Sequence, residues 1–277
     1  MFEKIVQLRG KKTGSTSIIL AGVHGDERCG VEALTALLPT LTIAAGRVLF
    51  GYGNPFAIQA NRRFMEADLN RMFQSNAALI EAQIASSEYR RAQFLKPVLQ
   101  QADALLDLHA SFTPQSTPFV ICEANAAGIA EFLPPERIVS GFDRVEPGGT
   151  DNYMNQLGKI GICVECGFLG DPESTRVAKE SVLAFLDARG HFGGERIPRQ
   201  TRKSYVHMTE LYRTTTDHFT LSRPFEDFEK LRKGEHIGRD GAKAIRAKSA
   251  GVILFARNRN QAGSEGFLFG ETKNSLA

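Results

Sequence analysis

The feature that most constrains the fold is a regular alternation of strand-like and helix-like segments over residues 1–195. Short apolar runs, such as residues 15–23 and 103–111, have the length and composition of buried strands. Segments with helical spacing of apolar residues, such as 27–40 and 172–190, lie between them. This order is typical of an α/β layer, in which helices cover a sheet.

The composition and the pattern of apolar residues change after about residue 195. The following segment is polar, and the rest of the chain consists of short strand-like runs separated by glycine turns. We therefore predict two domains. Residues 1–195 form the catalytic α/β domain, and residues 200–277 form a small β-rich C-terminal domain.

Composition excludes several classes of protein. The 277 residues carry a formal net charge of +3 without a dense Lys/Arg run, which argues against a nucleic-acid partner. The apolar runs are strand-sized, and the N-terminus lacks a secretory signal pattern, so we expect a cytoplasmic protein with no membrane partner. Cys163 and Cys166 form a C-x-x-C inside an apolar run, where we expect them to be buried rather than redox-active.

The first candidate site motif begins at His24, where a buried strand turns into a helix. Imidazole and carboxylate are good zinc ligands, and Gly25 lets the chain turn so that His24 and Glu27 can face one point. The H-x-x-E pattern alone is weak, because His207 and Glu210 share it. That second pair lies in a strand-like segment, where residues three apart face opposite sides, so we expect no metal there.

A second motif, at the end of another apolar strand, contains Asp107 and His109. The two side chains share one face of the strand. His109 offers a third ligand, and two histidines with one glutamate leave a coordination position open, as in catalytic zinc sites. Asp107 suits an outer carboxylate that orients a ligand imidazole. The alternative is that His109 is a core histidine with a local hydrogen bond.

Two further features suit catalysis. Glu165 lies in an otherwise apolar strand, where a carboxylate is costly unless it is paired, ligated or functional, and it could serve as a general base. Three arginines lie within residues 61–71, among Asn and Asp residues. This segment is either a solvated charged loop or a loop that recognises anions and stabilises an oxyanion.

Together these segments resemble the succinylglutamate desuccinylase and aspartoacylase family, which is related in its catalytic fold to the zinc carboxypeptidases. The resemblance spans residues 17–168. It departs from the family pattern at Asp26, where many members have Asn, and at Ala110, where aspartoacylases more often have Asn. It implies a mixed sheet flanked by helices, followed by a small β-rich C-terminal domain. The motifs that carry it are His24-Gly-Asp-Glu27, Asn54-Pro55, Arg63-Phe64, Asp68-Leu69-Asn70-Arg71, Asp107-Leu-His109 and Glu165-Cys-Gly167.

The resemblance also implies roles for individual residues. The implied roles are His24, Glu27 and His109 as ligands of one zinc ion per subunit, Arg63 as the group that polarises the scissile carbonyl, Asn70 and Arg71 as ligands of the substrate carboxylate, and Glu165 as the general base and later the proton donor.

The expected function is zinc-dependent hydrolysis of the amide bond in a small anionic N-acyl amino acid. A metallocarboxypeptidase acting on short peptides is the alternative, and it would use the same metal and the same residues to bind the substrate carboxylate. Hydrolysis of another small amide or an ester remains open, and a homo-oligomer is compatible with the sequence. A zinc-binding protein without activity would need no base, so Glu165 argues against it.

Overall fold

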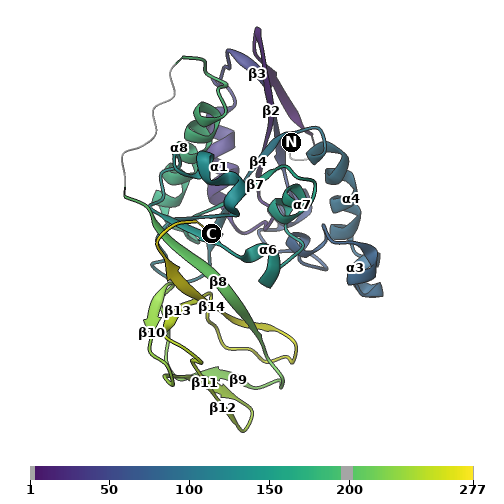
Figure 1. Ribbon diagram of the computed structural model, residues 1–277. Helices are drawn as coiled ribbons and strands as arrows, with labels where there is room; N and C mark the ends of the chain where they lie inside the picture. Colours follow the sequence, from purple (N-terminus) through teal and green to yellow (C-terminus); the bar gives the residue numbers. More distant parts are fainter. Residues whose placement is uncertain (1–3, 195–201, 277) are drawn as a thin grey trace.

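The computed structural model describes residues 4–194 and 202–276, shown in Figure 1. The α/β alternation expected over the first part of the chain and the β-rich character of the last part are both confirmed. The N-terminal part contains β1 (Val6–Arg9), β2 (Lys12–Ala21), α1 (Arg28–Leu37), β3 (Ala45–Tyr52), α2 (Pro55–Ala60), the 3-10 turns η1 (Leu69–Arg71) and η2 (Asn76–Ala78), α3 (Glu81–Ala85), α4 (Ser87–Leu99), β4 (Ala104–Ser111), β5 (Phe119–Cys122), η3 (Ala124–Ala126), α5 (Ala127–Ala130), β6 (Arg137–Ser140), α6 (Phe142–Val145), α7 (Thr150–Gln156), β7 (Ile160–Phe168) and α8 (Pro172–Ala188).

The C-terminal part consists of strands, namely β8 (Ser204–Arg213), β9 (Phe219–Leu221), β10 (Glu229–Leu231), β11 (His236–Asp240), β12 (Lys243–Arg246), β13 (Gly251–Leu254) and β14 (Glu265–Lys273). Strand β8 pairs in parallel with β6, so the main sheet continues from the N-terminal part into the C-terminal part. The division into two domains stays a prediction, and its boundary at residues 195–200 lies outside the described residues.

The main sheet of the described chain has 11 strands in the order β1-β3-β2-β4-β7-β5-β6-β8-β14-β13-β10. Strands β3, β2, β4 and β7 are parallel, whereas β5 runs antiparallel to β7. From β8 onward, β14, β13 and β10 pair antiparallel. The sheet is therefore mixed, as the predicted fold class requires. A separate sheet has the order β12-β11-β9.

Helices cover both faces of the parallel strands, with α1 and α8 on one face and α4 and α7 on the other (Figure 1). Strands buried on both faces read as continuous apolar runs, and every residue of β4 is buried. Alternate residues of β2 enter different cores: Ile19 packs with the α1 and α8 side, and Ile18 with the α4 side. None of the described helices is both long and apolar enough to cross a lipid bilayer.

The chain order places a crevice at the carboxyl ends of β2 and β4. From β2 the chain passes through α1 to β3 on one side, and it later returns to form β4 on the other side. Ligand sites in open α/β sheets lie at such a switch in strand order. His24 and Glu27 follow β2 directly, and His109 lies near the end of β4.

Gly25 is required here by close packing rather than by an unusual backbone angle. Its φ is not among the positive values of the described residues. A Cβ atom at Gly25 would lie 2.1 Å from the carbonyl carbon of Ala57 in α2. The Gly25 N–H also donates to the carbonyl oxygen of Arg63, at 3.2 Å. Gly25 therefore lets the β2–α1 turn pack directly against α2 and the loop that follows it.

We predict that Gly25→Ala lowers the free energy of unfolding by about 1–3 kcal/mol, because the new methyl group overlaps the Ala57 backbone. Urea denaturation measures the change. Gly128→Ala is the matched control, because a Cβ there meets nothing within 4 Å. Equal stability of the two variants would contradict the packing argument.

Candidate active site

Two imidazoles and one carboxylate converge at the crevice. The Nδ1 atom of His24 lies 2.8 Å from Oε1 of Glu27, and Nδ1 of His109 lies 2.9 Å from Oε2 of the same carboxylate. All three side chains are buried, and their potential ligand atoms lie within 4.8 Å of one another. The structure thus brings together the three predicted metal ligands, and the donor set suits zinc.

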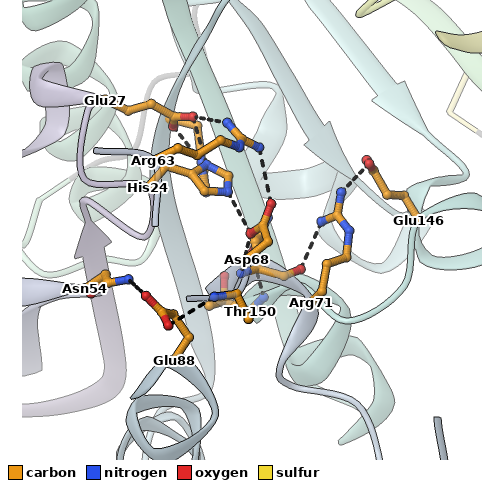
Figure 2. A network of polar contacts seen from close by, with 12 residues as sticks. His24, Glu27, Asn54, Arg63, Asp68, Arg71, Glu88, Glu146 and Thr150 are labelled. Carbon is orange, nitrogen blue, oxygen red and sulfur yellow. Dashed lines mark hydrogen bonds and ion pairs between the residues drawn. The ribbon is translucent and has the colours of Figure 1, made fainter. Parts of the chain in front are cut away.

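Carboxylates contact the far nitrogen of each imidazole. Nε2 of His24 lies 3.0 Å from Oδ1 of Asp68 (Figure 2), and Nε2 of His109 lies 3.2 Å from Oδ2 of Asp107. Asp107 also accepts a 2.5 Å hydrogen bond from the Thr150 hydroxyl. The hydrogen bond to Asp68 orients the His24 ring, whereas Asp107 lies within ion-pair distance of the His109 ring, and both Nδ1 atoms face Glu27. The contact to Asp107 was expected, whereas no role was predicted for Asp68.

Glu27 is held in its ionised form. Burial raises the pKa of this carboxyl, but the imidazoles of His24 and His109 outweigh burial and bring the pKa well below its usual value. The backbone N–H of Ala110 also donates to Oε2, at 3.1 Å. An ionised carboxylate between two imidazoles is the form that binds a divalent cation.

Glu165 lies beside His109, because the two residues are paired in the register of β4 and β7. Its Oε2 atom is buried and has no hydrogen-bond partner among the described residues. Burial, followed by the charge of Glu27, raises the pKa of Glu165 to about 8. A carboxyl group that gains and loses a proton near neutral pH suits general acid–base chemistry.

Arg63 reaches the same point from the loop that follows α2. Its Nη1 atom donates to Oε1 of Glu27 at 3.1 Å, and its Nη2 atom lies 3.5 Å from Oδ2 of Asp68 (Figure 2). The side chain retains 31% exposure and lines the pocket. A guanidinium there can approach the carbonyl oxygen of a bound substrate.

Buried Glu88 of α4 organises the loop that carries Arg63. Its carboxylate accepts hydrogen bonds from the backbone N–H groups of Met65 and Ala67, at 2.8 and 3.2 Å. The side-chain amide of Asn54 donates to it at 3.1 Å (Figure 2). Glu88 was not among the predicted site residues, because its spacing from the loop in sequence gives no signal of this contact.

Arg71 lies deeper in the pocket and is already paired. Its guanidinium binds the carboxylate of Glu146 (Figure 2) and lies 3.3 Å from the carboxylate of Glu265, at the start of β14. Asn70 accepts a 3.4 Å hydrogen bond from the backbone N–H of Thr150 through Oδ1. The positive charge of Arg71 is therefore largely balanced within the pocket.

The C-terminal strands form one wall of this pocket. No residue of this wall was predicted as part of the site, because none lies near a recognisable motif. The wall residues are Leu211, Phe255, Arg257, Arg259, Glu265, Phe267 and Leu268.

A second group of potential ligands, Asp107, His109 and Cys163, shares His109 with the first. Burial raises the pKa of the Cys163 thiol well above its usual value, which disfavours the thiolate that metals bind. Asp107 is already bound by Thr150. The group centred on Glu27 therefore offers the better metal site.

His207 and Glu210, the other H-x-x-E pair, bind different partners. Nδ1 of His207 lies 2.9 Å from the Ser140 hydroxyl, and Glu210 pairs with Lys248. The structure does not bring the two side chains into one group of potential metal ligands among the described residues.

The chain matches one known protein family over most of its N-terminal part. The model of the succinylglutamate desuccinylase/aspartoacylase catalytic domain matches residues 13–189, which is more than half of the chain. A succinylglutamate desuccinylase of Erwinia tasmaniensis is 25% identical over 284 residues, covering 88% of this chain and 80% of the relative.

Solved structures show the same fold. The crystal structure of succinylglutamate desuccinylase from Vibrio cholerae has a TM-score of 0.80 at 21% identity, covering 96% of this chain and 84% of the other. The crystal structure of a succinylglutamate desuccinylase/aspartoacylase from Rhodobacter sphaeroides has a TM-score of 0.72 at 21% identity, covering 98% and 89%.

We predict that Glu88→Gln lowers the free energy of unfolding by about 1–3 kcal/mol at pH 7, because an amide N–H would face the backbone donors of Met65 and Ala67. Burial raises the pKa of Glu88, but its hydrogen bonds outweigh burial and lower it. A lowered folded-state pKa stabilises the fold above the ordinary glutamate range, and this stabilisation is lost as pH falls.

The difference in free energy of unfolding between wild type and Glu88→Gln should therefore become smaller as pH falls. Urea denaturation at pH 7 and at acid pH, with exposed Glu136→Gln as the control, measures it. A difference that grows as pH falls would contradict the assignment.

Proposed function

We propose that this chain, which belongs to the succinylglutamate desuccinylase/aspartoacylase family and is a hydrolase acting on an amide, is a zinc-dependent deacylase of an N-acyl amino acid. One observation supports the proposal most: each oxygen of Glu27 faces an imidazole nitrogen, one from His24 and one from His109. They lie near an oxygen of Glu165 that has no hydrogen-bond partner in the described part of the chain.

The residues fit a single zinc ion per subunit. His24 and His109 would bind it through Nδ1, and Glu27 would bind it through its carboxylate. When bound, zinc supplies a Lewis acid that polarises the substrate carbonyl and makes a nearby water more acidic. Asp68 holds the His24 imidazole through a hydrogen bond to Nε2, and Asp107 places a negative charge within ion-pair distance of Nε2 of His109.

Glu165 moves the proton. Its carboxylate removes a proton from the attacking water, whose oxygen adds to the amide carbon. Arg63 stabilises the negative charge that develops on the former carbonyl oxygen. Glu165 then gives the proton to the leaving nitrogen, and the C–N bond breaks to yield a carboxylic acid and an amino acid.

Asn70 and Arg71 are assigned to the carboxylate of the amino-acid half. A substrate carboxylate must share Arg71 with Glu146 and Glu265. Burial raises the pKa of Glu146 to about 7, despite the charge of Arg71. Glu146 can therefore take up a proton near neutral pH, which leaves positive charge on Arg71 for the substrate.

A metallocarboxypeptidase acting on short peptides is the second candidate. The wall formed by Phe255, Phe267 and neighbouring residues of the C-terminal strands favours a small substrate, because it closes one side of the pocket. Comparing turnover of N-acyl amino acids with that of dipeptides separates the two functions. Adding other small amides and esters to this comparison tests whether the chain hydrolyses them instead. The cytoplasmic location and the oligomeric state stay predictions.

We predict that Glu165→Gln lowers kcat by about 10²–10⁴-fold, because the amide cannot carry the proton. Zinc content, measured by atomic absorption, should stay at the wild-type level, since Glu165 is not a proposed ligand. Glu81→Gln, an exposed position on α3, is the control. Near-normal kcat in Glu165→Gln would remove this residue from its role.

We predict that His109→Ala sharply lowers the zinc content of the purified protein, because one of three ligands is lost. His218→Ala is the control, since that side chain is 82% exposed. Metal analysis that finds full zinc occupancy in His109→Ala would reject the ligand assignment.

A further inference from the structure

The segment between β9 and β10 carries a carboxylate on which several donors converge. Asp227 accepts hydrogen bonds from the hydroxyls of three residues, at 2.9, 2.9 and 2.7 Å; they are Ser111, Thr113 and Ser116. All three donor residues are buried, and they lie at the end of β4 and in the segment that follows it. Hydrogen bonds to an ionised acceptor are the strong ones. Asp227 therefore ties the end of β4 to the C-terminal part of the chain.

A fourth hydrogen bond brings in the wall of the pocket. The backbone N–H of Phe255, which follows β13, donates to Oδ1 of Asp227 at 3.0 Å. Phe255 and Phe112 both line the pocket, and the centres of their rings lie 5.6 Å apart. Phe112 stands between Ser111 and Thr113, which both donate to Asp227. One carboxylate thus fixes the backbone on which both pocket-lining rings are carried.

Aromatic rings pack beside these hydrogen bonds. Phe228, the residue after Asp227, contacts Phe119 of β5 edge to face, with ring centres 4.9 Å apart. The Phe119 ring lies 6.0 Å from that of Phe255. The guanidinium carbon of Arg137 lies 4.1 Å from the centre of the Phe228 ring and places a positive charge in the same region. Hydrogen bonds in such a poorly hydrated environment are stronger than in water.

Backbone strain is concentrated at the same place. Four non-glycine residues of the described chain have positive φ, and three of them adjoin the contacts of Asp227, namely Gln115 at 61°, Phe228 at 65° and Phe255 at 55°. Phe228 follows Asp227 directly, and Phe255 donates to it. Bulky residues rarely adopt this conformation, and such strain persists only where the surroundings impose it, often around binding sites. The contacts of Asp227 therefore hold both segments in positions that their backbones do not favour.

The proposed metal centre does not depend on these contacts. The imidazoles of His24 and His109 are positioned by the carboxylate of Glu27. The donors to Asp227 begin two residues after His109 and lie on the far side of the pocket from α1, in segments that form its wall. Loss of the Asp227 carboxylate should therefore move the wall and leave the metal ligands in place.

We propose that Asp227 is a positioning residue that sets the width of the pocket, because it holds the rings of Phe112 and Phe255 in place and so limits the size of the substrate. This proposal rests on the proposed deacylase function. A small N-acyl amino acid fits between the rings and the metal centre, whereas a bulky acyl or amino-acid group meets the rings. Asp227 acts through these two residues and takes no part in proton transfer.

Three substrates measure the size limit. N-acetylalanine is small, N-benzoylalanine has a bulky acyl group, and N-acetylphenylalanine has a bulky amino-acid half. In zinc-loaded Asp227→Ala, we expect KM for N-acetylalanine to rise about 10-fold and kcat to change by less than about threefold, since the wall holds the ground state and the transition state equally. The ratio of kcat/KM for a bulky substrate to that for N-acetylalanine should rise about 10-fold.

Further variants separate positioning from a general loss of structure. Asp227→Asn should recover most of the wild-type KM, because the amide oxygen still accepts hydrogen bonds and hydroxyl groups can accept from the amide nitrogen. Thr113→Val removes one of the four hydrogen bonds and should raise KM by a smaller factor. Asp217→Asn is the control, since that side chain is 69% exposed.

A fall in kcat without a rise in KM in Asp227→Ala, or an unchanged ratio between bulky and small substrates, overturns the proposal. If Asp227→Ala does not fold, Thr113→Val decides the question, and an unchanged KM in that variant overturns the proposal.

Hydrogen exchange tests the positioning without turnover. In Asp227→Ala, the amides of residues 111–116 and 253–257 should exchange about 10-fold faster than in wild type, whereas those of residues 104–109 should keep their protection. If wild type hydrolyses none of the three substrates while this result holds, the deacylase function fails and the positioning of the wall by Asp227 stands. Unchanged exchange in both wall segments overturns the positioning role.

Discussion

The arrangement of the site depends on the carboxylate of Glu27 and the two imidazoles on either side of it. Each oxygen faces one Nδ1 atom, so a single side chain sets the positions of His24 and His109. Outer carboxylates lie beside the opposite nitrogen of each ring, with a hydrogen bond at His24 and an ion-pair distance at His109. The proposed metal ligands are therefore fixed by contacts within the protein, and three buried groups of this kind are tolerated because each has a charged partner.

The sequence predicts the parts of the site that follow directly from strands. The apolar runs around β2, β4 and β7 locate three strand ends, and the polar residues after or within them converge because parallel strands end at one edge of a sheet. The mixed α/β fold follows from the same periodicity. Glu88 is different, because its role comes from contacts between a loop and a helix that leave no local pattern. Asp68 lies in one of the motifs that carry the family resemblance, but its contact with His24 joins two segments distant in the chain and is not apparent from the sequence.

The C-terminal wall could not be predicted from the sequence for a related reason. Arg257 lies in a short polar segment between two strands, which reads as an ordinary surface turn. Its place in the pocket depends on the pairing of β8 with β6, which joins the last strands to the main sheet. It depends also on Asp227, whose carboxylate contacts both the end of β4 and the start of the Arg257 segment. Both are long-range interactions, which single-sequence patterns do not encode.

The pairing of β4 with β7 limits how the proposed catalytic centre can vary among related sequences. His109 and Glu165 stand opposite each other on adjacent parallel strands. Side chains alternate between the two faces of a sheet, so a shift of one residue in β7 would turn Glu165 away and present an apolar neighbour instead. The spacing between the proposed metal ligand and the proposed proton carrier is thus set by backbone hydrogen bonds. Insertions in surface loops leave that spacing intact, whereas an insertion of one residue within either strand abolishes it.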